Sequence, residues 1–154
     1  MWESTKRTNN LICVLLCFLS GNPCLSIGGD TLSRGQSLSV SGTQTLISKD
    51  GIFELGFFTP GSNSSQNTYL GIWYKDFPER TTVWVANREA PLGQGSTLEI
   101  AQNGNLVLMS RDSDAVWSTN LMSTLPETVE AVLLDSGNLI LRDGLSPSTV
   151  LAEF

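Results

Sequence analysis

The residues that could do chemistry in this chain are carboxylates that have no histidine to work beside them. The 154-residue sequence contains no histidine, which removes the usual general base, the Ser-His-Asp triad and the commonest zinc ligand. Paired carboxylates could still act as they do in glycoside hydrolysis. Asp112 and Asp114 are such a pair, but they fall in a polar turn just before the strand-like run 115–118. We therefore expect no catalytic residue, no metal site, no cofactor and no enzymatic activity.

The distribution of charge argues against nucleic acid as a partner. The chain carries nine basic and fifteen acidic residues. The basic residues form no run and do not alternate with aromatic residues, as they do in proteins that bind nucleic acid. The scattered charges are typical of a surface that keeps the protein soluble.

The first 26 residues have the pattern of a secretory signal peptide. Lys6 and Arg7 precede an uncharged apolar stretch, Leu11–Leu19, and small residues around Ser26 suit a signal peptidase. Nine apolar residues are too few to cross a bilayer, which takes about 20. We expect a signal peptide over residues 1–26, no transmembrane segment in this chain, and a secreted, extracellular domain over residues 27–154.

The cysteines all lie in that leader, at Cys13, Cys17 and Cys24. The secreted domain must therefore fold in an oxidising compartment without a disulfide, around a hydrophobic core. A loop rich in Pro, Gly, Ser and Asn, residues 59–68, contains the acceptor sequence Asn63-Ser64-Ser65. We expect an N-linked glycan on Asn63.

A short phrase recurs along the domain and sets its architecture. Gly51–Leu55 is echoed by Gly104–Leu108 and by Gly137–Leu141, and each copy follows a polar turn. Asp-Gly and Asn-Gly favour hairpin turns because the glycine adopts a positive φ. The rest of the domain consists of runs of four to six β-branched or aromatic residues at close spacing. This pattern predicts an all-β barrel, prism or sandwich.

Three tryptophans lie within these strand-like runs, at Trp73, Trp84 and Trp117. Their apolar neighbours favour a role in filling the core. The alternative is a platform on which a sugar stacks, and it would require an exposed ring.

Several segments in order resemble one plant family. Phe53–Phe58, Tyr69–Tyr74 and Thr82–Leu92, followed by Gly104–Leu108 and Val116–Asn120, are similar to the bulb-type (mannose-binding-like) lectin domain of plant G-type lectin S-receptor-like serine/threonine kinases and S-locus glycoproteins. The resemblance extends over residues 30–150. It implies a β-prism II, in which three four-stranded antiparallel sheets surround a pseudo-threefold axis with tryptophans at the centre.

The resemblance also implies where a sugar would bind. Mannose-binding members carry Gln-x-Asp-x-Asn-x-Val-x-Tyr, whose alternate side chains project from one face of a strand. The best copy here is Ala101, Asn103, Asn105, Val107 and Met109, with two of five residues matched. The other copies, with one match each, are Leu134, Ser136, Asn138, Ile140 and Arg142, and Ser48, Asp50, Ile52, Glu54 and Gly56. The candidate carbohydrate-binding residues are therefore Asn103, Asn105, Val107 and Asn138, whose asparagines could instead serve turns and strand edges.

The end of the sequence departs from the family pattern. Members continue into a Trp-Gln-Ser-Phe-Asp-Tyr-Pro-like segment, whereas Val150-Leu151 is followed here by Ala152-Glu153-Phe154. We expect a C-terminally truncated domain that lacks the last strand and the third core tryptophan. The family's cysteine-rich modules, membrane helix and kinase domain do not occur in this sequence.

Together these features predict an extracellular recognition module that binds glycan or protein partners in plant cell-surface signalling. The resemblance implies receptor dimerisation, and a plasma-membrane location for the full-length family. Two alternatives stay open: an active mannose-specific lectin with a mannose-type glycan ligand, and a non-functional truncated remnant.

Overall fold

Every regular element in the described part of the chain is a β-strand. The computed structural model describes residues 29–61 and 67–154. The predicted signal peptide and the sequon at Asn63 lie outside the described residues. The strands are β1 (Thr31–Ser33), β2 (Ser37–Ser39), β3 (Leu46–Ile47), β4 (Phe53–Phe58), β5 (Tyr69–Tyr74), β6 (Thr82–Val85), β7 (Thr97–Ile100), β8 (Leu106–Met109), β9 (Ala115–Ser118), β10 (Val129–Leu133), β11 (Leu139–Asp143) and β12 (Ser146–Glu153).

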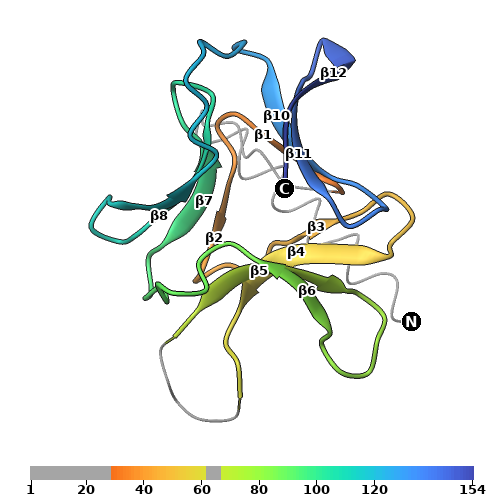
Figure 1. Ribbon diagram of the computed structural model, residues 1–154. Helices are drawn as coiled ribbons and strands as arrows, with labels where there is room; N and C mark the ends of the chain where they lie inside the picture. Colours follow the sequence, from red (N-terminus) through yellow and green to blue (C-terminus); the bar gives the residue numbers. More distant parts are fainter. Residues whose placement is uncertain (1–28, 62–66) are drawn as a thin grey trace, which may run out of the picture.

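The strands form three four-stranded antiparallel sheets that surround a common centre (Figure 1). We name each by its third strand: the β5 sheet (β3-β4-β5-β6), the β8 sheet (β2-β7-β8-β9) and the β11 sheet (β1-β10-β11-β12). In each sheet, three consecutive strands form a meander and one short strand from residues 31–47 pairs along its first edge. The predicted all-β prism of three sheets is confirmed.

The predicted loss of the last strand is wrong. β12 spans Ser146–Glu153 and pairs with β11, so the β11 sheet has its full set of four strands. Phe154 continues the ladder, since its N–H donates to the Leu139 carbonyl and its carbonyl accepts from the Leu139 N–H. The prediction was based on the absence of the family's Trp-Gln-Ser-Phe-Asp-Tyr-Pro-like segment. Strand pairing, however, requires only an extended backbone whose N–H and C=O groups can bond to the neighbouring strand.

The repeat identified around Gly51 also needs correction. Cross-strand partners in the three sheets align as rows, which are Leu46–Leu55–Ile72–Trp84, Leu38–Leu98–Leu108–Trp117 and Leu32–Ala131–Leu141–Ala152. These rows make β5 the counterpart of β8 and β11. The Gly51–Leu55 copy instead leads into β4, so its assignment to the motif positions was wrong.

The repeated sequence motif marks one type of turn; it does not mark equivalent positions in the three sheets. Gly51, Gly104 and Gly137 have φ of 75°, 87° and 87°. Each donates its N–H to the carbonyl three residues earlier, at 2.8, 2.9 and 3.0 Å. A positive φ costs glycine little because it has no Cβ. The same turn joins β3 to β4, β7 to β8, and β10 to β11.

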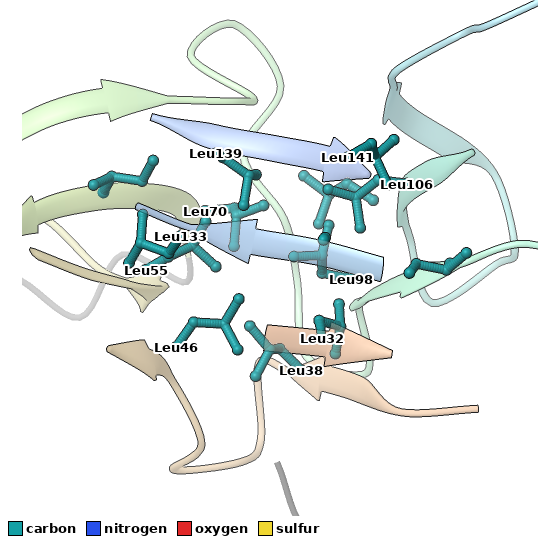
Figure 2. Packing of buried hydrophobic residues seen from close by; sticks show 14 of the residues in the cluster. Leu32, Leu38, Leu46, Leu55, Leu70, Leu98, Leu106, Leu133, Leu139 and Leu141 are labelled. Atoms are coloured by element: carbon teal, nitrogen blue, oxygen red, sulfur yellow. The ribbon is translucent and has the colours of Figure 1, made fainter. Parts of the chain in front are cut away.

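The core lies where the three sheets face one another, and leucines dominate it. Figure 2 shows leucines from all three sheets converging on one cluster, among them Leu38, Leu55 and Leu141. Alternation along each strand explains this, because every second side chain points inward. A fully buried leucine contributes about 1.5–3 kcal/mol relative to an exposed one.

Aromatic rings close one end of this core. Trp84 and Trp117 meet edge to face with centroids 5.6 Å apart, and Trp117 meets Phe154 in the same way at 5.5 Å. Trp84 and Trp117 end the rows of cross-strand partners in the β5 and β8 sheets, and Ala152 ends the equivalent row in the β11 sheet. The third tryptophan is therefore absent, as expected. Phe154, two residues further on the same side of the strand, contacts Trp117 in its stead. Figure 1 shows the C-terminal end of the chain lying between the three sheets.

Leu108→Ala tests the shared core. Leu108 is fully buried in the middle of β8, so the truncation should lower the free energy of unfolding by about 2–5 kcal/mol in a urea titration. Met122 is 99% exposed, and Met122→Ala should leave the midpoint unchanged. Equal midpoints for the two variants would contradict the core described here.

Asp143 gives the fold a predictable response to acid. Hydrogen bonds from the Thr128 hydroxyl and the Leu145 backbone N–H lower the pKa of Asp143. A carboxyl with a lowered folded-state pKa adds stability that is present above its unfolded pKa, about 3.9, and is lost as the pH falls through the folded value. Asp143→Asn should therefore lower Tm at pH 7 and flatten the fall of Tm on acidification. Asp112→Asn, in an exposed turn, should keep the parent profile; a parent profile for Asp143→Asn as well would refute the assignment.

Candidate functional site

Asn105 is buried, and the fold itself uses its side-chain amide. Its Oδ1 accepts from the Thr119 hydroxyl and the Leu121 N–H, both at 2.7 Å, and its Nδ2 donates to the Leu121 carbonyl at 3.2 Å. These bonds hold the segment that follows β9 against the start of β8. A group bound in this way offers little to a sugar that competes with water.

The other predicted positions on β8 are also engaged or covered. Asn103 is exposed in the turn, where its Oδ1 accepts from the Asn105 N–H at 3.1 Å. Val107 faces outward between Glu99 and Ser118 but is only 7% exposed. In the β8 sheet, the predicted positions therefore stabilise the turn and the packing of the strand.

Asn138 lies in a different sheet from these three residues. It precedes β11, and its Nδ2 donates to a Glu153 carboxylate oxygen. Arg142, at the last motif position of this copy, forms an ion pair with Glu130 at 2.7 Å. The four predicted carbohydrate-binding residues are thus divided between two sheets and do not line one pocket.

A polar cleft of about 190 Å³ opens on the outer face of the β5 sheet instead. One wall is the segment between β2 and β3, which contributes hydroxyl groups and the amide of Gln44. The floor comes from Glu54 and Phe57 on β4 and from Trp73 on β5. Arg80, from the loop between β5 and β6, forms the far rim.

Glu54 is the centre of this cleft. One carboxylate oxygen accepts from the Thr45 hydroxyl at 2.8 Å, and the other accepts from the Trp73 indole N–H at 3.1 Å. Gly56 allows this approach, because a Cβ there would lie 2.7 Å from the Thr45 methyl and 3.1 Å from the Trp73 ring. Each carboxylate oxygen keeps a second lone pair for another donor.

Arg80 covers the ring of Trp73. Its guanidinium carbon lies 4.5 Å from the Trp73 ring centroid and 5.7 Å from that of Phe58, which are cation–π distances. In the part of the chain that the structure describes, no acceptor binds the guanidinium N–H groups. The cleft is therefore lined both by an acceptor that two hydrogen bonds hold in place and by a guanidinium that has no acceptor among the described residues.

Sequence reasoning missed Glu54, Trp73 and Arg80 as a group. Glu54 was placed at the valine position of a misaligned copy, and Trp73 was assigned to the core. Trp73 is buried, with 5% of its surface exposed, but it lies outside the leucine cluster. Local pattern shows that Glu54 faces outward in Phe53-Glu54-Leu55, but its place beside the Trp73 indole follows only from the pairing of β4 with β5.

The described residues also bear on two other kinds of functional feature, a metal site and a membrane span. They contain no group of three or more His, Cys, Asp or Glu side chains that could hold a metal ion. No helix in the same residues is long and apolar enough to pass through a membrane.

Comparisons with known proteins show the family to which this chain is related. A family model for D-mannose binding lectin matches residues 81–153. A G-type lectin S-receptor-like serine/threonine-protein kinase of Arabidopsis thaliana is 46% identical over 128 residues, which are 83% of this chain. The chain is a bulb-type lectin domain homologous to those of plant S-domain receptor kinases. An S-locus-specific glycoprotein of Brassica oleracea is 47% identical over 136 residues, or 86% of this chain.

The lectin domain is a small part of these relatives. It spans 15% of the Arabidopsis kinase and 28% of the Brassica glycoprotein. The match lies in the lectin part and does not include a kinase domain.

Solved structures share the prism. A monomeric mannose-binding lectin from Gastrodia elata aligns with a TM-score of 0.57 and 20% identity, covering 80% of this chain and 94% of that one. The snowdrop (Galanthus nivalis) mannose-specific agglutinin, complexed with methyl-α-D-mannoside, aligns with a TM-score of 0.52 and 18% identity, covering 73% and 87%. At these identities the likeness establishes the fold.

Asn105→Ala separates a structural role from a sugar-binding role. The variant loses three buried or partly buried hydrogen bonds, and we expect the free energy of unfolding to fall by about 2–3 kcal/mol in a denaturant titration. Asn103→Ala, in the exposed turn, is the matched control and should cost well under half as much. A fully stable Asn105→Ala protein would contradict the structural role.

Proposed function

We propose that this lectin domain is an extracellular recognition module that binds a saccharide in the cleft of the β5 sheet. The observation that carries the proposal is that the Glu54 carboxylate, bonded to the Trp73 indole, and the Arg80 guanidinium, which lies over the Trp73 ring and has no acceptor among the described residues, line the same cleft. The hydroxyls of a sugar ring need both acceptors and donors, and these two groups of the cleft supply one of each.

The remaining lining of the cleft suits the same class of ligand. Ser39, Thr43 and Thr45 add hydroxyl groups, and Gln44 adds an amide, around a predominantly polar cavity. The indole of Trp73 is held by Glu54 and covered by Arg80. Because the Arg80 guanidinium covers the Trp73 ring, that face is not open for a sugar to stack on. Recognition in this arrangement therefore depends on hydrogen bonds to the hydroxyls of the sugar ring.

The relatives support a saccharide as the ligand class, and the residues separate this domain from a mannose-specific lectin. The snowdrop agglutinin was solved with methyl-α-D-mannoside on the same fold. This chain lacks the Gln and Tyr of the mannose motif at every copy. Each lost hydrogen bond is worth on the order of 1 kcal/mol, and a single monosaccharide site has little to spare. The favoured ligand is therefore a saccharide other than a simple mannoside.

The location and the biological role follow from the relatives. Receptor-like kinases and an S-locus glycoprotein share this domain, so we place it outside the cell as a ligand-reading part of plant cell-surface signalling. Three complete sheets around one leucine core support a folding domain over a non-functional remnant.

The proposal is tested by glycan-array screening of the purified domain, followed by titration calorimetry with the best ligand. Arg80→Ala removes the donors and Glu54→Gln removes the charged acceptor, and each should weaken binding roughly tenfold or more. Arg80→Lys keeps the charge but not the planar fork, so it should rescue binding only in part.

Arg88→Ala removes an exposed arginine that lies outside the cleft and should bind like the parent protein. Circular dichroism must show parent-like folding for all variants. Binding of an array ligand that survives both Arg80→Ala and Glu54→Gln would overturn the assignment of the cleft.

A further inference from the structure

We propose a second binding surface, a groove between the β5 and β11 sheets that takes one aromatic side chain of a protein segment flanked by lysine or arginine. The groove has a volume of about 290 Å³. It is separate from the saccharide cleft, with which it shares no lining residue.

The groove exists because the aromatic triangle at the end of the core is open on one side. Trp84 contacts Trp117, and Trp117 contacts Phe154, both edge to face. On the third side, no ring contact joins Phe154 to Trp84 among the described residues, and both rings line the groove. The row of cross-strand partners puts Ala152 where the other two sheets have an indole. The side chain that would close the triangle is therefore missing from the β11 sheet.

The walls of the groove are aromatic and aliphatic. Phe53 and Tyr74, whose ring centroids are 4.7 Å apart, form one wall with Val83. Val83 is 42% exposed. Phe77 is 61% exposed, and its ring meets that of Tyr74 at a tilt of 47°, with centroids 5.2 Å apart. Exposed apolar surface that continues into a groove marks a site of protein interaction.

Two of the polar groups of the opposite wall already take part in hydrogen bonds within the protein. The Ser136 hydroxyl accepts from the Asn138 N–H, and the Asn138 side chain donates to Glu153. A saccharide would bring hydroxyl groups that find few partners here, and burying them unpaired is costly. An aromatic ring brings no such cost and can meet Trp84 or Phe154 edge to face.

The rim of the groove is acidic. Glu153 adjoins Phe154 and contacts Asn138, while Asp135 adjoins Ser136 and accepts from the Asp50 N–H at 2.8 Å. The two ion pairs found in the described residues, Lys75–Asp76 and Arg142–Glu130, include neither Glu153 nor Asp135. Lys49 is the one neighbouring cation on that turn. The negative electrostatic potential of this rim favours a partner whose anchor residue has basic neighbours.

Size and charge select a peptide segment over the other occupants. The volume is close to the lower limit of ligand pockets, about 300 Å³, and is enough for one large side chain. An acidic rim repels the anionic surface of a membrane. An aromatic anchor between basic residues satisfies the groove and the rim together, and such anchors dominate the energetics of interfaces.

The test uses the purified chain and the peptide acetyl-Lys-Arg-Trp-Arg-Lys-amide, with binding followed by fluorescence anisotropy of a labelled copy. We expect saturable binding that weakens as salt rises from about 0.05 to 0.5 M. Replacing the peptide's Trp by Ala should weaken binding roughly tenfold or more, and replacing its basic residues by Glu should abolish it. Equal binding of the Trp and Ala peptides, or binding of the acidic peptide, would overturn the proposal.

Variants of the protein locate the site. Val83→Ser should weaken the Trp peptide roughly three- to tenfold, and Asp135→Asn should reduce the salt dependence. Met122→Ser changes an exposed side chain outside the groove and should bind like the parent. Parent-like binding by Val83→Ser, or recruitment to vesicles of phosphatidylcholine and phosphatidylserine in place of peptide binding, would refute this assignment. The peptide assay contains no saccharide. Its result can therefore be interpreted even if the domain binds no saccharide in the cleft of the β5 sheet.

Discussion

The structure depends on a leucine core that no single sheet can bury. Each four-stranded sheet turns a leucine-rich face inward, and three such faces must meet to exclude water. The N-terminal part of the domain makes that arrangement obligatory, because β1, β2 and β3 follow one another in sequence and belong to three different sheets. Leu32, Leu38 and Leu46, one from each of these strands, are all fully buried. A short segment therefore ties the three meanders together without a disulfide.

The inward face was readable from sequence, and strand pairing was not. Alternation in runs such as Thr97–Ile100 indicates which side chains point inward, so the all-β class and a hydrophobic core follow from local pattern. The turn around Gly51 looks like the turns around Gly104 and Gly137 because all three have the same local geometry. Which strand follows the turn is decided by pairing with residues far along the chain, and local similarity carries no information about it. The same limit explains β12, whose place depends on β11.

The outer face could not be predicted because equivalent positions hold unrelated side chains. The same cross-strand pair is Glu54 with Trp73 in the β5 sheet, Glu130 with Arg142 in the β11 sheet, and Thr97 with Met109 in the β8 sheet. The first is joined by an indole hydrogen bond, the second by an ion pair, and the third has no charge at all. Outward substitutions leave the core untouched, so one scaffold can carry three different surfaces. The cleft arises from the first pair and could be recognised only after the strands were paired.

The centre of the prism shows how a local loss becomes a surface feature. Replacing an indole by Ala152 removes a core contact, but the ladder of β12 with β11 does not depend on that side chain and persists through Phe154. Phe154 restores the contact with Trp117 and leaves the side toward Trp84 open. A symmetric triangle of rings would have sealed the end of the core on all sides. The rings of the open side are held in different ways, Trp84 by packing against the shared core and Phe154 by its backbone bonds to Leu139. A side chain that is already held in place loses less entropy when an aromatic ligand side chain enters the groove.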